Sequence, residues 1–113
     1  MKYLLMIYGN HQAYGAMSPD GFDRIMRAHK SLTEEITASG ELIETNELSI
    51  DGAKIVRTHD GVVAITDGPF IEVKEMLAGY CLVECANVER AIEIAGSLAE
   101  SEFAPIEVRR IGH

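Results

Sequence analysis

The sequence predicts an α+β fold of the split βαβ type, with a β-hairpin inserted between its two halves. Two observations support this prediction. Two segments with helical periodicity each lie between segments with strand character, and a turn signal stands near the middle of the chain. The length of 113 residues suits one domain, so residues 1–113 are assigned to a single domain.

The first β-α-β unit opens with a strand that is expected over residues 3–8. Ser18 then has the side chain of a helix N-cap, and Pro19 stands at the first helical position, where its missing N–H is not needed. Apolar residues follow at spacings of three and four, and Gly40 is the expected stop of this helix. The next strand is expected over residues 41–49.

The inserted hairpin is expected around His59-Asp60-Gly61, because an Asp-Gly pair readily adopts the backbone angles of a two-residue turn. Its two strands are expected over residues 54–58 and 62–66. The second β-α-β unit follows, with Asn87 as the N-cap of a helix whose periodicity continues to Ala99. The remaining strand segments are expected over residues 70–73, 79–85 and 106–111.

Composition and charge limit the function classes. The formal net charge of −8 argues against a nucleic-acid-binding surface, because neutralising phosphates requires clustered Lys and Arg. No apolar stretch approaches the roughly 20 residues of a membrane span. The apolar start is short and lacks the small-residue cleavage site of a signal peptide. A cytoplasmic protein without a membrane or nucleic-acid partner is therefore expected.

The sequence indicates neither a metal nor a cofactor. Cys81 and Cys85 lie four residues apart in a predicted strand, about 13 Å apart between their Cα atoms, which is too far for a disulfide. With no histidine nearby, they are expected to be small buried apolar residues and not zinc ligands. The chain also lacks a nucleophile elbow, a phosphate loop and a dinucleotide fingerprint.

Both faces of the predicted sheet are apolar. The alternating side chains of residues 3–8 are apolar on both faces, and so are those of residues 62–65. The two helices cover one face only, so the other face needs a cover. A symmetric homodimer is the expected solution, with a ligand cavity in that face as the alternative. The candidates to line the covered face are Leu5, Ile7, Val63, Ile65 and Leu82, although the period of two leaves the choice of face open.

A strongly specified turn runs from Asp67 to Phe70, with the sequence Asp-Gly-Pro-Phe. The Asp side chain can accept backbone hydrogen bonds within the turn, and Pro69 fixes its own φ. Glu72 and Lys74 follow in the next predicted strand, where they share one face. These charges either pair along a solvated strand or form the wall of a binding site.

This stretch, followed by Leu77 and Gly79-Tyr80, resembles the signature of the DGPF-domain branch of the YCII-related family. The resemblance covers nearly the whole chain. It implies a ferredoxin-like domain that dimerises through its sheet into a dimeric α/β-barrel assembly. Two positions depart from the family pattern: Asn46 stands where the family has glycine, and Arg110 stands where it has proline. The second departure leaves any role of the C-terminal edge open.

The resemblance does not specify a reaction, but it suggests a catalytic pair of one His and one Asp. His29 and Asp67 are the candidates in this chain. His29 lies on the apolar face of the first predicted helix, and a histidine beside a carboxylate is suited to general base catalysis near neutral pH. The alternative is a core histidine whose ring is satisfied by the backbone.

Two functions are left open. The first is a lyase- or hydrolase-like enzyme acting on a small anionic molecule, whose charge Arg57 or Arg109 would bind through bidentate hydrogen bonds. Glu72 and Lys74 are expected to contribute to the same substrate site. The second is a non-catalytic ligand-binding or regulatory module, which the resemblance associates with sigma-factor systems.

Overall fold

The computed structural model describes residues 1–9, 16–49, 51–68, 76–102 and 104–112. Its elements, in chain order, are β1 (Lys2–Gly9), α2 (Pro19–Ala38), β2 (Leu42–Glu47), β3 (Lys54–His59), β4 (Val62–Asp67), β5 (Met76–Glu84), α3 (Val88–Ser97), the short 3-10 helix η1 (Ala99–Glu102) and β6 (Ile106–Arg110). The expected mixed α+β class is confirmed.

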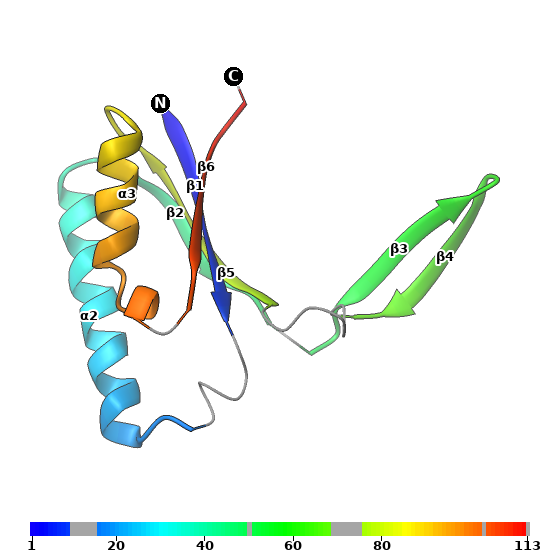
Figure 1. Ribbon diagram of the computed structural model, residues 1–113, viewed down its shortest axis with the longest axis horizontal. Helices are drawn as coiled ribbons and strands as arrows, with labels where there is room; N and C mark the ends of the chain where they lie inside the picture. The colour runs from blue at the N-terminus through cyan, green and yellow to red at the C-terminus, as the bar shows by residue number, and fades with distance from the viewer. Residues whose placement is uncertain (10–15, 50, 69–75, 103, 113) are drawn as a thin grey trace.

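Four of the strands form one antiparallel sheet in the order β2-β5-β1-β6. The units β1-α2-β2 and β5-α3-β6 therefore interleave their strands, as a split βαβ arrangement requires. Both helices lie on the same side of this sheet (Figure 1). Strands β3 and β4 form a separate two-stranded sheet that projects away from the helices (Figure 1). Among the described residues, the strands form an open sheet and not a closed barrel.

The predicted helix and turn signals act as expected. The Ser18 side chain accepts a hydrogen bond from the backbone N–H of Gly21 at 3.0 Å, and Asn87 caps α3 by accepting from the N–H of Arg90 at 2.9 Å. Gly40 has φ +80° directly after the end of α2. The hairpin turn places Asp60 at φ 50° and Gly61 at φ 75°, which is the pair of positive φ angles that a type I′ turn needs.

Two differences from the predicted elements concern the second unit. The predicted helix continues to Ala99, whereas α3 ends at Ser97 because Leu98 adopts an extended backbone with ψ 129°. The chain then turns into η1, and the Ser101 hydroxyl donates to the carbonyl oxygen of Leu98 at 2.8 Å. This break in the helix gives Glu100 a direction that helical periodicity does not predict. The strand expected over residues 70–73 lies outside the described residues.

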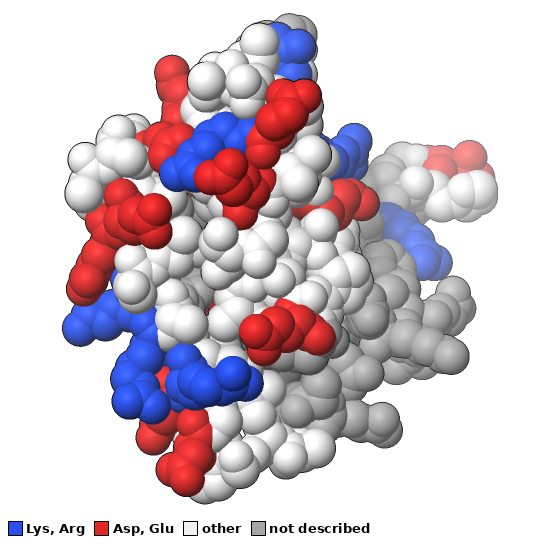
Figure 2. Space-filling view, turned by 60° about the vertical axis from the view of Figure 1, so that its left-hand side comes forward, with Lys and Arg blue, Asp and Glu red and all other residues white. Residues whose placement is uncertain are grey.

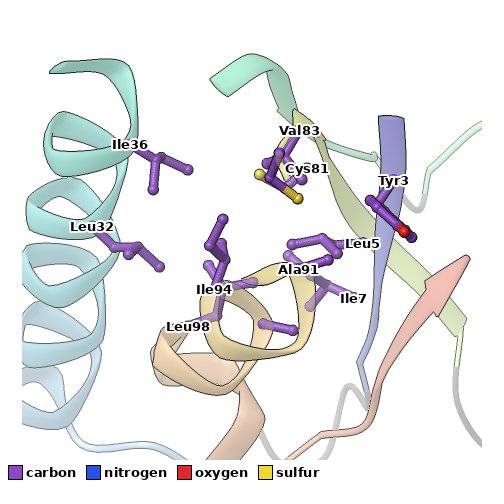
Figure 3. Close-up of a cluster of buried hydrophobic side chains, with 12 residues drawn as sticks. Tyr3, Leu5, Ile7, Leu32, Ile36, Cys81, Val83, Ala91, Ile94 and Leu98 are labelled. Carbon is purple, nitrogen blue, oxygen red and sulfur yellow. The ribbon is translucent and has the colours of Figure 1, made fainter. Parts of the chain in front are cut away.

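The hydrophobic core lies between the helices and the sheet. Figure 3 shows Leu32 and Ile36 of α2 and Ile94 of α3 pointing toward Leu5 of β1 and Val83 of β5. Leu5, Ile36, Ile94 and Val83 are the largest fully buried side chains among the described residues. The prediction that Leu5 and Ile7 line the open face is therefore wrong, since both belong to the core.

The open face of the sheet carries the alternate residues of the central strands. Leu4 pairs with Leu82 and Met6 pairs with Tyr80 across β1 and β5, and all four side chains are only partly buried. Tyr8 follows them in β1. The apolar open face that the sequence predicted therefore exists. Of the predicted lining residues in β1 and β5, Leu82 lies on this face, whereas Leu5 and Ile7 lie in the core.

The helix-bearing side shows acidic and basic side chains interspersed among uncharged ones (Figure 2). Within the described ranges, no helix has both the length and the apolar character needed to cross a membrane.

Candidate functional site

The candidate site centres on a contact between His29 and Glu100. His29 comes from the middle of α2 and Glu100 from η1, and Nδ1 of the imidazole lies 3.0 Å from Oε1 of the carboxylate. The side chain of Glu100 is only 8% exposed, whereas that of His29 is 27% exposed. The structure therefore joins a partly accessible imidazole to an almost completely buried carboxylate.

The orientation of the ring decides which nitrogen can act. Nδ1 is enclosed and has no well-aligned hydrogen bond among the described residues, so the 3.0 Å contact is an ion pair that falls short of a linear hydrogen bond. Such contacts often tighten only when a ligand binds. Because Nδ1 is turned toward Glu100, the Nε2 side of the ring is the part left to meet a ligand. Oε2 of Glu100 is also enclosed and lacks a hydrogen-bond partner among the described residues.

The pKa shifts of the two groups agree with an ion pair. The contact with Glu100 raises the pKa of His29 above its ordinary value of 6.5, burial opposes this rise, and the negative charge of Glu47 adds to it. Burial alone would raise the pKa of Glu100. The contact with His29 and a hydrogen bond from its own backbone outweigh burial, so the pKa of Glu100 lies below its ordinary value of 4.5.

A cavity of about 290 Å³ borders this pair. It lies between the N-terminal half of α2 and the neighbouring ends of β2 and β5, on the helix-bearing side of the sheet. Its described lining residues are Ile7, Phe22, Met26, His29, Thr45, Asn46, Glu47, Leu48, Ala78, Gly79 and Glu100. The volume is near the lower end of the usual range for small-molecule sites.

The close pairing of β2 and β5 shapes the floor of this cavity. Gly79 lies opposite Glu47, and a Cβ atom at Gly79 would stand 3.0 Å from the carbonyl oxygen of Asn46. The hydroxyl of Thr45 donates to the carbonyl oxygen of Tyr80 at 3.0 Å and fixes the same strand pair. Glycine at position 79 thus lets the two strands approach each other beside the cavity.

The structure does not bring the predicted pair His29 and Asp67 together. Asp67 ends β4, its side chain is 87% exposed, and it forms an ion pair at 2.5 Å with Lys54, its register partner in β3. The reason is topological, because the hairpin is a separate sheet that projects away from α2 (Figure 1). The carboxylate beside His29 is that of Glu100.

The arginines expected to bind substrate lie elsewhere as well. Arg57 is in β3, opposite Ala64 of the hairpin. Arg109 pairs with Leu4 and so lies on the open face of the sheet, whereas the cavity lies on the helix-bearing face. Neither arginine lines the cavity. Glu72 and Lys74 fall outside the described residues.

Sequence reasoning missed Glu100 and Glu47. Glu100 directly follows a segment whose helical periodicity was predicted to continue to Ala99, and no pattern in the sequence singles it out. Only the break at Leu98 turns it inward, and nothing in the local sequence marks that break. Glu47 was included in a predicted strand, but its place beside the cavity depends on the register of β2 against β5.

The described residues contain no group of three or more His, Cys, Asp or Glu side chains placed to hold a metal ion. What the site does offer is an imidazole with one oriented nitrogen, a carboxylate behind it and an apolar wall. These are the groups that general acid–base catalysis requires.

Comparison with known proteins places the chain in a family. The model of the YCII-related domain matches residues 1–111, so the chain belongs to the YCII-related family. It is also similar to an uncharacterized protein of Rhizobium meliloti (strain 1021), with 28% identity over 102 residues, which cover 89% of this chain and 82% of that protein.

Proposed function

We propose that this protein is a small-molecule enzyme of the lyase or hydrolase type, in which His29 exchanges a proton with the substrate and Glu100 orients His29. The observation that carries this proposal is the 3.0 Å contact between Nδ1 of His29 and the buried carboxylate of Glu100 at the wall of a cavity. Glu100 is a positioning residue, because it acts on the substrate only through the imidazole.

The chemistry follows from the ring orientation. Glu100 favours the tautomer that carries its proton on Nδ1, which leaves the lone pair of Nε2 free to accept a proton. In a lyase step, Nε2 takes the proton of a C–H bond next to a carbonyl. The electron pair of that bond forms a C=C bond, and a leaving group departs with its own bonding pair. The imidazolium formed in this step is stabilised by the negative charge of Glu100.

The finer family assignment belongs to the same proposal. The sequence Asp67-Gly68-Pro69-Phe70 together with Gly79-Tyr80 supports membership of the DGPF-domain branch. The close approach of β2 explains why position 79, at the cavity floor, is a glycine: a side chain there would contact the backbone of β2.

A homodimer is also part of this proposal. The open face of the sheet carries Leu4, Met6 and Leu82, which no element of the described chain covers completely. The projecting hairpin adds Val56, Val62, Val63 and Ile65, whose exposures of 58–66% are high for large apolar side chains. A second copy placed against this open face would cover it and extend the assembly toward the barrel that the resemblance implies.

Deuterium exchange tests the proton transfer without knowledge of the natural substrate. Phenylacetone and cyclohexanone have exchangeable C–H bonds next to a carbonyl and are small enough to use as probes. We expect the protein to accelerate their exchange beyond an equal concentration of free imidazole, as followed by proton NMR. The variant His29→Gln should lose the acceleration.

Matched carboxylate variants separate the role of Glu100 from a general charge effect. Glu100→Gln should lower the exchange rate by up to the roughly 10²- to 10⁴-fold that general acid–base catalysis supplies. Glu102→Gln is the control, because Glu102 is an exposed neighbour in the same short helix and its contact with Arg24 is a long 3.8 Å. Exchange no faster than that with free imidazole, or full activity in His29→Gln, would contradict the proposal and favour a non-catalytic binding module.

A further inference from the structure

We propose that the cavity beside His29 takes a small organic cation, an apolar body that carries one protonated amine, and discriminates against carboxylates of the same shape. This inference rests on the proposed function, because it names the substrate class of the same cavity. It replaces the anionic ligand that the sequence predicted from Arg57 and Arg109, neither of which lines the cavity.

The charge of the cavity wall is the first argument. Its described lining residues include three ionisable groups, His29, Glu47 and Glu100, and neither lysine nor arginine. Two carboxylates against one imidazole leave a charge of −1 when His29 is protonated and −2 when it is neutral. The described wall is therefore negative in both states, and a bound anion would face like charges in a partly desolvated site.

The hydrogen-bonding capacity of the wall is the second argument. Oε2 of Glu100 is enclosed without a partner among the described residues, and the Glu100 side chain lines the cavity, so a hydrogen-bond donor that reached this oxygen would satisfy it. Glu47 is exposed at the cavity rim, and its charge acts on His29, so the two lie close to each other. A protonated amine has three donors and no acceptor, which matches a wall rich in carboxylate oxygens.

The apolar part of the cavity wall determines which apolar group the ligand can carry. Ile7, Phe22, Met26, Leu48 and Ala78 contribute apolar surface. The volume of about 290 Å³ is about twice that of a cavity known to hold benzene, roughly 150 Å³. One ring with a short amine-bearing chain therefore suits both the size and the polarity of the site.

Three probes of similar size and different charge, each with one phenyl ring, test the inference: benzylamine, benzyl alcohol and benzoate. Each is titrated into the full-length protein at pH 7 while the backbone NMR signals of Thr45 and Gly79 are followed, because both residues line the cavity. We expect benzylamine to bind at least about tenfold more tightly than benzoate, with benzyl alcohol between them, which is the order of effect of one unit charge at a partly exposed site.

Two variants assign the preference to the cavity wall. Glu47→Gln should reduce the ratio of benzylamine to benzoate affinity several-fold. Glu34→Gln removes the same charge from an exposed position of α2 that does not line the cavity, and it should leave the ratio unchanged. Both positions are exposed, so neither change is expected to unfold the protein.

Three results would overturn the inference: benzoate binding as tightly as benzylamine, an unchanged ratio in Glu47→Gln, or no response of the cavity signals to any of the three probes at millimolar concentration. The deuterium exchange of neutral ketones does not depend on this preference. A protein that exchanges ketones through His29 but prefers benzoate would therefore keep the proposed function and lose only the substrate class.

Discussion

Arg90 in the first turn of α3 donates two hydrogen bonds to Glu41, the residue that directly precedes β2. Its Nε donates to Oε2 at 2.9 Å and its Nη2 donates to Oε1 at 2.8 Å. Both side chains are mostly buried, and the contact lowers the pKa of Glu41 to about 2. The backbone of Glu41 also accepts from the N–H of Glu84 at 2.8 Å, so the pair fastens α3 to the edge of the sheet.

The first prediction concerns the two-hydrogen-bond pair of Arg90 and Glu41. Arg90→Lys keeps the charge but loses the paired geometry, and we expect a loss of about 1–2 kcal/mol in the free energy of unfolding. Urea denaturation measures the loss. Arg24→Lys is the matched control, because Arg24 and Glu102 are both largely exposed and 3.8 Å apart, and it should change stability by less than about 0.5 kcal/mol. Equal losses of unfolding free energy in the two variants would show that the Arg90–Glu41 pair contributes no more to stability than the exposed Arg24–Glu102 pair.

The second prediction concerns pH. His29 has a raised pKa in the folded protein, so its contribution to stability is complete below pH 6.5 and disappears as pH rises through the folded-state pKa. Glu100 has a lowered pKa, so its contribution is complete above pH 4.5 and disappears at lower pH. The pair therefore stabilises the fold most between pH 4.5 and 6.5.

Thermal unfolding between pH 5.5 and 8.5 measures the basic side of this window. The midpoint of the wild-type protein should fall as pH rises above 6.5, and this slope should be reduced in Glu100→Gln. The same slope in both proteins would mean that another group causes the pH dependence.

The third prediction concerns the floor of the cavity. Gly79→Ala places a Cβ atom 3.0 Å from the main-chain oxygen of Asn46, and a main-chain atom in a paired strand cannot move aside easily. We expect a loss of about 1–3 kcal/mol in the free energy of unfolding, as for other overpacked sites. Gly96→Ala in α3 has no atom within 4 Å of the new Cβ and should be neutral or stabilising by up to about 1 kcal/mol. A neutral Gly79→Ala would show that β2 and β5 can separate without cost.

The fourth prediction concerns the open face. Light scattering at micromolar concentration should give the mass of two chains. Leu82→Arg should shift the protein toward the monomer while the circular dichroism spectrum stays folded. Ile92→Arg introduces the same charge at an exposed apolar position of α3 and should leave the dimer intact. A wild-type monomer over the whole concentration range would exclude the homodimer.

Local chemistry explains why most of the fold could be predicted from the sequence. Ser18, Asn87 and Gly40 act within a few residues of their own positions, and each has the predicted role at a helix end. The turn at Asp60-Gly61 is equally local. By contrast, the period of two in a strand does not reveal which face meets the helices, and Leu5 and Ile7 were assigned to the wrong one.

The candidate site could be predicted only in part, because its second half depends on long-range contacts. His29 was identified from its place on an apolar helix face. Its carboxylate partner stands 71 positions further along the chain and reaches it only through the break after α3. Asp67 was chosen because the turn fixes it locally, but the register of the hairpin gives it Lys54 as its partner.

The pKa of His29, measured by NMR on the imidazole ring, tests the central pairing most directly. Three proteins are compared: the wild type, Glu100→Gln and Asp67→Asn. Glu100→Gln should lower the pKa of His29, because the charge that stabilises the imidazolium is removed while the shape of the side chain is kept. Asp67→Asn should leave it unchanged, because Asp67 pairs with Lys54 on the hairpin. A fall of the His29 pKa in Asp67→Asn, or an unchanged value in Glu100→Gln, would contradict the account.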